Sequence, residues 1–175
     1  MKKLIKISTL LCLAVVLIIS CKPDMDFSIG QSQNRIAQLK GSWKLQTVIQ
    51  TDVNARDNNY VDPTRPGLDV VKKDITNAFP YTDIVITFAE DASSLPTTFT
   101  INYGAAPPVF KHTTGTWTAD NLKTPGIIKL INGTDTFSVK LGAVNNLSSD
   151  MVTLQKIKSQ GTKPKIQYDY NFKKI

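Results

Sequence analysis

The chain has 175 residues, which is enough for one domain with a single hydrophobic core and a short additional segment. It carries 21 basic and 14 acidic residues, one histidine and a net charge of +7. Its two cysteines, Cys12 and Cys21, both lie near the N-terminus. The remainder of the chain therefore has no thiol for catalysis, for a disulfide or for a cysteine metal site.

The N-terminal segment has the layout of an export signal. Lys2, Lys3 and Lys6 precede an apolar run over Leu10–Ile19, and a small residue separates this run from Cys21. The run is too short for a transmembrane helix, which needs about 20 apolar residues. The segment resembles the signal of bacterial lipoproteins, in which the cysteine is lipidated and becomes the first residue of the mature chain.

This resemblance implies a signal peptide over residues 1–20 and a lipid anchor at Cys21. Residues 21–34 are polar and are expected to form a flexible tether. Lys22 stands where lipoproteins of the inner membrane typically have aspartate, so the resemblance implies sorting to the outer membrane. Whether the protein faces the periplasm or the cell surface stays open.

Loss of the three signal lysines lowers the net charge from +7 to +4. An exported, anchored protein with this charge is not expected to bind nucleic acid. Positive charge gathers near the C-terminus, which we interpret as a solvated surface, with contact to anionic headgroups or glycans as the alternative. The cluster comprises Lys156, Lys158, Lys163, Lys165, Lys173 and Lys174.

Beyond the tether, apolar and polar residues alternate with a period of two. This pattern is typical of antiparallel strands with one buried face. In the first such segment Trp43, Leu45, Thr47 and Ile49 are expected to share the buried face. Eight strands are predicted, at residues 43–50, 84–88, 98–103, 115–118, 127–131, 136–141, 151–157 and 165–173.

The connection between the first two of these segments is long and contains a different pattern. Apolar residues in the stretch from Asp69 to Phe79 fit one face of a short amphipathic helix, which would end at Pro80. Such a helix could cover one mouth of a barrel. Elsewhere the connections are short, and Asn132-Gly133 predicts a tight hairpin.

Two glycine-x-tryptophan sequences occur, one within Leu39–Leu45 and one at Gly115–Trp117. Together with the aromatic residues Tyr168 and Phe172 of the last segment, they resemble lipocalin-like domains. The last segment resembles the closing strand of small lipocalin-like lipoproteins of Gram-negative bacteria, most of which have no known function. The resemblance implies an all-β fold over residues 35–175, an eight-stranded antiparallel barrel, with the short helix between its first two strands.

The interior of an eight-stranded barrel is either filled by side chains or holds one small ligand. Inward aromatic residues are expected to pack the core first, and to contact a small apolar molecule or a glycan fragment if a cavity exists. These candidate ligand-binding residues are Trp43, Phe88, Phe99, Trp117, Phe137, Tyr168 and Tyr170.

Catalytic groups are scarce. The only histidine, His112, is expected in a solvated loop, and the only glutamate, Glu90, at a strand end. No nucleophile elbow, phosphate loop or zinc-protease motif is present, so neither an enzyme nor a cofactor is predicted. One polar cluster could surround calcium, but it lacks the glycine and glutamate of an EF-hand loop, and we interpret it as turn residues and predict no metal site. It comprises Asp52, Asn54, Asp57, Asn58, Asn59 and Asp62.

Two functions remain from different classes. The first is a lipid-anchored envelope protein that binds a small molecule in its barrel. The second is an interaction or structural module of an outer-membrane protein complex. Its long loops, 51–68 and 104–111, would contact the partner, because loops on a rigid scaffold commonly carry recognition.

Overall fold

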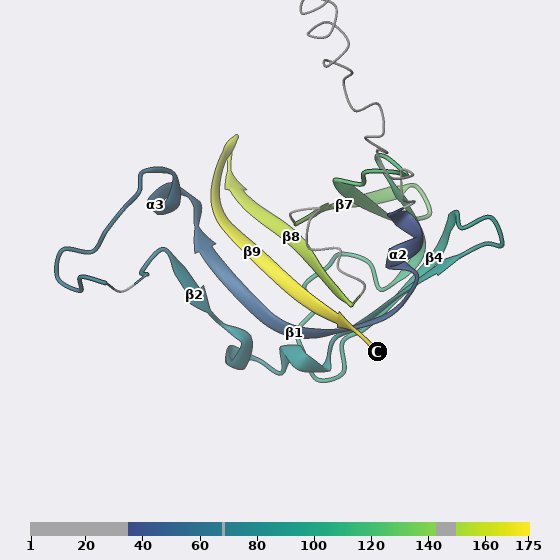
Figure 1. Ribbon diagram of the computed structural model, residues 1–175, viewed down its shortest axis with the longest axis horizontal. Coiled ribbons are helices and arrows are strands. Elements are labelled where there is room, and N and C mark those ends of the chain that lie inside the picture. The colour runs from purple at the N-terminus through teal and green to yellow at the C-terminus, as the bar shows by residue number, and fades with distance from the viewer. Residues whose placement is uncertain (1–34, 68, 143–149) are drawn as a thin grey trace, which may run out of the picture. The chain divides into compact units, whose positions relative to one another are not determined.

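The computed structural model describes residues 35–67, 69–142 and 150–175 (Figure 1). The predicted signal peptide, the tether and the lipidation site Cys21 lie outside these ranges. Within them no helix is both long and apolar enough to cross a membrane. The strands are β1 (Gly41–Asp52), β2 (Lys72–Asp74), β3 (Val85–Glu90), β4 (Pro96–Asn102), β5 (Thr114–Ala119), β6 (Ile127–Asn132), β7 (Asp135–Leu141), β8 (Met151–Gln160) and β9 (Lys163–Lys174). The helical elements are α2 (Ile36–Leu39), α3 (Val53–Asp57) and the 3₁₀ turns η1 (Thr76–Ala78) and η2 (Tyr81–Asp83).

Eight of the strands form a closed antiparallel barrel. Strands β3 to β9 pair in chain order, and β1 closes the barrel by pairing with β3 on one side and with β9 on the other. The ninth strand, β2, pairs only with the far end of β1. Each predicted strand corresponds to a strand of the barrel, so the predicted all-β, eight-stranded fold is confirmed.

The first strand departs from strict alternation. A β-bulge between Leu45 and Thr47 inserts one extra residue relative to β9, and this reverses which side chains face inward. Val48 is therefore fully buried, while Thr47 and Ile49 are only half-buried. The prediction that Thr47 and Ile49 share the buried face of Trp43 was wrong for this reason.

The predicted helix from Asp69 to Phe79 is also corrected. This stretch forms β2 and η1, because the far end of β1 extends past β3 and needs backbone partners there. The Val48 amide donates to the Thr76 hydroxyl at 2.8 Å, and the Ile75 amide donates to the Val48 carbonyl at 2.9 Å. The short helix between the first two barrel strands is instead α3, which begins directly after β1.

Both tryptophans lie in the core, and each indole N–H has a partner. Trp43 Nε1 donates to the carbonyl of Leu39 in α2 at 2.7 Å, and Trp117 Nε1 donates to the carbonyl of Ala89 at 2.8 Å. The rings of Phe88 and Trp117 lie 4.8 Å apart between centroids. The helix α2 thus packs beside Trp43, at the end of the barrel where β1 begins.

The loop between β4 and β5 folds inward, although residues 104–111 were expected to be an exposed recognition loop. Val109 and Phe110 are buried, and the Phe110 ring lies 5.3 Å from Tyr170 and 6.4 Å from Phe137. Strands β7 and β8 pair at only two positions, so their remaining lengths leave an opening in the wall. The loop packs against both sides of this opening, since Phe110 lies beside Phe137 on β7 and Val109 accepts a hydrogen bond from Lys156 on β8.

The same inward course buries His112, which was predicted to be solvated. Its side chain is 8% exposed, and Nε2 lies 3.5 Å from Asp135 Oδ2.

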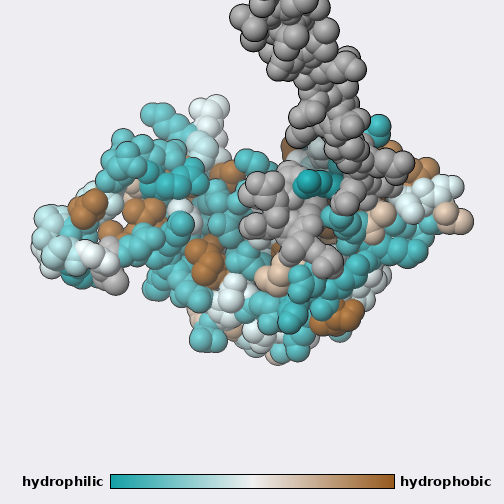
Figure 2. Space-filling view, viewed as in Figure 1, coloured by the Kyte–Doolittle hydropathy of each residue, from teal (hydrophilic) through white to brown (hydrophobic). Residues whose placement is uncertain are grey.

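The outer surface on the side shown in Figure 2 is mainly hydrophilic, with apolar residues in separate small patches. This agrees with strands that have one buried and one solvated face.

Candidate binding site at the barrel mouth

A hollow of about 260 Å³ lies at the end of the barrel away from Trp43, and we call it the mouth pocket. Its volume is just below the range of about 300–1,000 Å³ that is usual for small-molecule sites. The pocket is lined by inward-facing residues of β8 and β9, by the β4–β5 loop and by residues around η2. These residues are Phe79, Tyr81, Pro107, Pro108, Val109, Lys156, Lys158, Tyr168 and Tyr170.

Strand register explains why two lysines face the mouth pocket. Leu154 stands opposite Tyr170 and Lys156 opposite Tyr168, so alternate residues of β8 share the inner face of the barrel. Leu154 belongs to the core, whereas Lys156 and Lys158 continue the same face beyond it. The sequence pattern had placed these lysines in a solvated cluster, and only the register of β8 against β9 could have separated them from the others.

The lysine side chains have no acidic partner among the described residues. Lys156 Nζ donates to the carbonyl of Val109 at 2.6 Å and lies 5.7 Å from the centre of the Phe137 ring. Lys158 Nζ lies 5.5 Å from the centre of the Tyr168 ring. Burial, and then the neighbouring charge of Lys158, lowers the pKa of Lys156. The pocket therefore holds positive charge that no carboxylate of its lining offsets.

Aromatic rings form the other walls. Phe79 and Tyr81 meet edge to face, with centroids 5.5 Å apart, and Tyr168 and Tyr170 are stacked at 6.3 Å. Phe79 is 54% exposed at the rim. Burial raises the pKa of Tyr170, and the nearby Tyr81 adds to this effect, so its hydroxyl stays neutral at physiological pH. The walls offer flat apolar surfaces with polar edges.

Of the seven candidate ligand-binding residues, only Tyr168 and Tyr170 line the mouth pocket. Phe137 is half-buried behind Phe110. The other four are almost completely buried in the core and line neither the mouth pocket nor the second hollow described below: Trp43, Phe88, Phe99 and Trp117. Ligand contact by these residues stays a prediction. Sequence reasoning missed Phe79, Tyr81 and the β4–β5 loop, whose approach to the mouth depends on contacts distant in sequence.

A second hollow, the outer groove, has a volume of about 470 Å³ and lies on the outer face of the sheet. It is more open, and four of its polar side chains, Thr153, Gln155, Asp169 and Asn171, are already hydrogen-bonded to other side chains. The Thr153 hydroxyl donates to Asn171 Oδ1 at 2.7 Å, and Asn171 Nδ2 donates to Thr47 at 3.0 Å. Gln155 Nε2 donates to Asp169 at 2.9 Å. Because these groups satisfy each other, the mouth pocket is the stronger candidate site.

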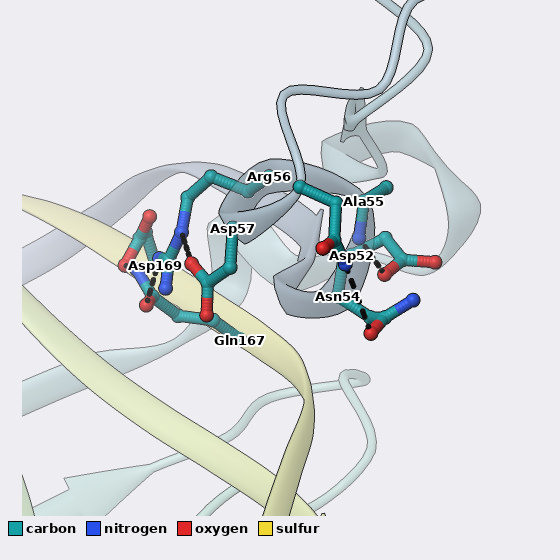
Figure 3. A network of polar contacts seen from close by, with 8 residues as sticks. Asp52, Asn54, Ala55, Arg56, Asp57, Gln167 and Asp169 are labelled. Atoms are coloured by element: carbon teal, nitrogen blue, oxygen red, sulfur yellow. Dashed lines mark hydrogen bonds and ion pairs between the residues drawn. The ribbon is translucent and has the colours of Figure 1, made fainter.

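The network on this face extends to α3, as Figure 3 shows. Arg56 Nη1 donates to Gln167 Oε1 at 3.1 Å, and Gln167 Nε2 donates to Asp169 Oδ1 at 2.8 Å. These bonds tie the short helix to β9, so Arg56 holds the connection against the sheet.

The polar cluster of the first connection serves local turns. Asp52 accepts from the Ala55 amide at 2.9 Å and so caps α3 (Figure 3). Asp62 Oδ2 lies 2.7 Å from Arg65, and hydrogen bonds from Thr64 lower the pKa of Asp62. In the parts of the chain that the structure describes, no three His, Cys, Asp or Glu side chains converge as a metal site would require.

Comparison with known proteins identifies the family but no function. No curated protein and no solved structure matches the chain significantly. A family model described as a domain of unknown function, DUF5004, matches residues 20–173, which is nearly the whole sequence. The chain, with its closed eight-stranded barrel, therefore belongs to the DUF5004 family.

Proposed function

We propose that this domain binds a small molecule in the mouth pocket, without catalysing a reaction. The observation that carries the proposal is a contrast between the two ends of the barrel interior. Near Trp43 the interior is filled by tightly buried side chains, whereas the mouth keeps a hollow with aromatic walls. Apolar and aromatic walls with a few polar groups are the usual composition of a small-molecule site.

The binding test is native mass spectrometry of the full chain in lipid nanodiscs, after exposure to an extract of the cell envelope. A discrete adduct that is lost on denaturation is expected for the wild type. It should weaken in Phe79→Ser, which removes a half-exposed ring from the pocket rim. Leu122→Ser is the matched control, because Leu122 is also partly exposed but does not line the pocket. An adduct that Phe79→Ser leaves unchanged would place the ligand elsewhere, and a bare mass would oppose the proposal.

We also propose that the protein is attached to the outer membrane through lipid on Cys21. The support is the sequence pattern of the first 21 residues, which resembles a lipoprotein signal. Two or three acyl chains would make the attachment effectively permanent, because one chain alone holds a protein only marginally. Cells grown with labelled palmitate should label the wild type and not Cys21→Ser. Label on the variant, or recovery of the wild type in the inner-membrane fraction, would contradict this part of the proposal.

A second candidate function is an interaction module of an envelope protein complex. The observation that favours it is the exposure of Tyr60 and Val61, 51% and 69%, in the connection between β1 and β2. Crosslinking in intact cells should then yield a heteromeric product that a Tyr60→Ser, Val61→Ser double variant loses. Recovery of the monomer alone would count against this candidate and leave small-molecule binding.

A further inference from the structure

The mouth pocket contains a charge imbalance that bears on the chemistry of its ligand. Two lysines line it, and no aspartate or glutamate does. Neither lysine forms an ion pair within the described residues. The influences on the Lys156 ammonium are burial and a second positive charge, without a carboxylate among them.

Lys156 also retains capacity for a ligand. An ammonium group has three donors, and one of them is used by the carbonyl of Val109 at 2.6 Å. This bond holds the side chain along the inner wall of the pocket, next to the β4–β5 loop. Lys158, two residues further along β8, is exposed, and its Nζ lies over the Tyr168 ring.

Placing these lysines here has a cost in the empty protein. Burial of an ammonium without a counter-charge is unfavourable, and a second like charge nearby adds repulsion. An uncharged polar residue would suit the wall of a hollow that held only water. An anion between the two ammonium groups would offset both costs, because charge-assisted hydrogen bonds are the stronger ones.

The remaining walls define the rest of the ligand. Phe79 and Tyr168 contribute ring surfaces to the lining, and Pro107 and Pro108 add further apolar contact. The volume of about 260 Å³ limits the occupant to one small molecule. A flat or apolar body with one charged end fits these walls.

We infer that the ligand of the mouth pocket is a small organic anion, with a carboxylate or similar group bound by Lys156 and Lys158 and an apolar or aromatic body against Phe79 and Tyr168. This inference rests on the proposed binding function and names the chemical class of its ligand. An aromatic acid and a fatty acid both meet this description, since they share the anionic group.

The test compares 2-naphthoate with 2-naphthamide, which have nearly the same shape and differ in charge. Binding is measured by equilibrium dialysis against the full chain in phosphatidylcholine nanodiscs, with empty discs to subtract partitioning into lipid. The wild type is expected to bind the carboxylate about ten-fold more tightly than the amide, as one charge-assisted hydrogen bond allows. Decanoate, tested in the same way, distinguishes an aliphatic from an aromatic source of the anion.

Substitutions of the two lysines then test whether the preference for the carboxylate over the amide arises in the mouth pocket. Lys158→Gln should bring the carboxylate and the amide to within about two-fold of each other, because it removes one ammonium and keeps the polar chain. Lys156→Met should have a similar effect, and the exposed Lys158 keeps the test valid if that variant fails to fold. Lys165→Gln is the control, because it removes the same charge from an exposed position of the same hairpin, outside the pocket.

The outcomes separate the two claims. Equal binding of naphthoate and naphthamide, both weakened by Phe79→Ser, would overturn the inference that the ligand is an anion. It would leave the proposed binding function intact. A preference for the anion that Lys165→Gln removes as strongly as Lys158→Gln would assign it to the general charge of the chain, and would also overturn the inference. Failure of every ligand to bind would remove the proposed function together with the inference.

Discussion

Lys156 on β8 stands directly opposite Tyr168 on β9, so an ammonium group and a phenol ring share the inner face of the barrel at its mouth. The same register places Leu154 opposite Tyr170 one step deeper, where both side chains are buried. One uninterrupted alternation thus builds the core and then the wall of the mouth pocket. The position of the lysines follows from the length of the β8–β9 hairpin beyond the core.

The hydrogen bond from Trp43 to Leu39 should matter for stability as much as the ring does. Trp43→Phe keeps an aromatic ring but leaves a buried carbonyl without its 2.7 Å partner and a small void beside α2. We expect the free energy of unfolding to fall by about 2–4 kcal/mol. Urea denaturation measures it, with the partly exposed Leu122→Ala as a control of small effect. A loss as small as that of the control would mean that α2 does not depend on this bond.

Gly115 should tolerate no side chain. A Cβ at this position would lie 2.0 Å from the carbonyl oxygen of Ile131 on β6, and its φ of +148° already disfavours other residues. Gly115→Ala must therefore separate β5 from β6 and is expected to lose more than about 3 kcal/mol. Gly133→Ala is the matched control, because it has φ of +60° but open space around it, and should lose only about 1–2 kcal/mol. Similar melting temperatures for the two variants would disprove the packing argument.

Asp120 should make stability depend on acid pH. Its Oδ1 accepts the amides of Ile127 and Gly126 at 3.0 and 2.9 Å, and these bonds lower the pKa of Asp120. Because the folded state favours the carboxylate, the stability that it contributes is complete above its ordinary pKa and is lost as pH falls through its lowered folded value. Melting curves from pH 7 to 2 should show Asp120→Asn less stable than wild type at neutral pH, with the gap closing in acid. A constant gap would rule out ionisation as the cause.

Glu90 should make stability depend on pH in the opposite direction to Asp120. Both of its carboxylate oxygens are buried without a hydrogen-bond partner, and this burial raises the pKa of Glu90, although Lys40 and Lys174 oppose the shift. The folded state therefore holds a proton more firmly, so wild-type stability relative to Glu90→Gln should rise as pH falls from neutral towards the ordinary pKa of glutamate. At pH 7 Glu90→Gln should melt at a higher temperature than wild type. A lower melting temperature at pH 7 would mean that the two lysines outweigh burial.

Much of the fold could be predicted because its signals are local. In β9, Tyr170 and Phe172 alternate with polar neighbours, and this pattern indicates a half-buried strand wherever its partner lies. The eight strands and the aromatic set of the core follow from such patterns.

The departures from prediction have non-local causes. The bulge before Thr47 is a feature of the pairing of β1 with β9, and residues Lys72–Asp74 form a strand because they pair with the far end of β1. His112 is buried because β7 and β8 separate and leave room for the β4–β5 loop. None of these facts can be inferred from the residues adjacent in sequence.

The position of the candidate site also has a non-local cause. By itself the sequence determined strands with inward aromatic residues, because alternation depends only on the strand's own geometry. Their closure into a barrel was expected only from the resemblance to lipocalin-like domains. The tertiary structure decided that the core would be filled at Trp43 and that the hollow would lie beside Lys156 and Lys158. The reason is that a pocket is a gap between packed elements, and its place is set by strand register and loop closure between segments far apart in the chain.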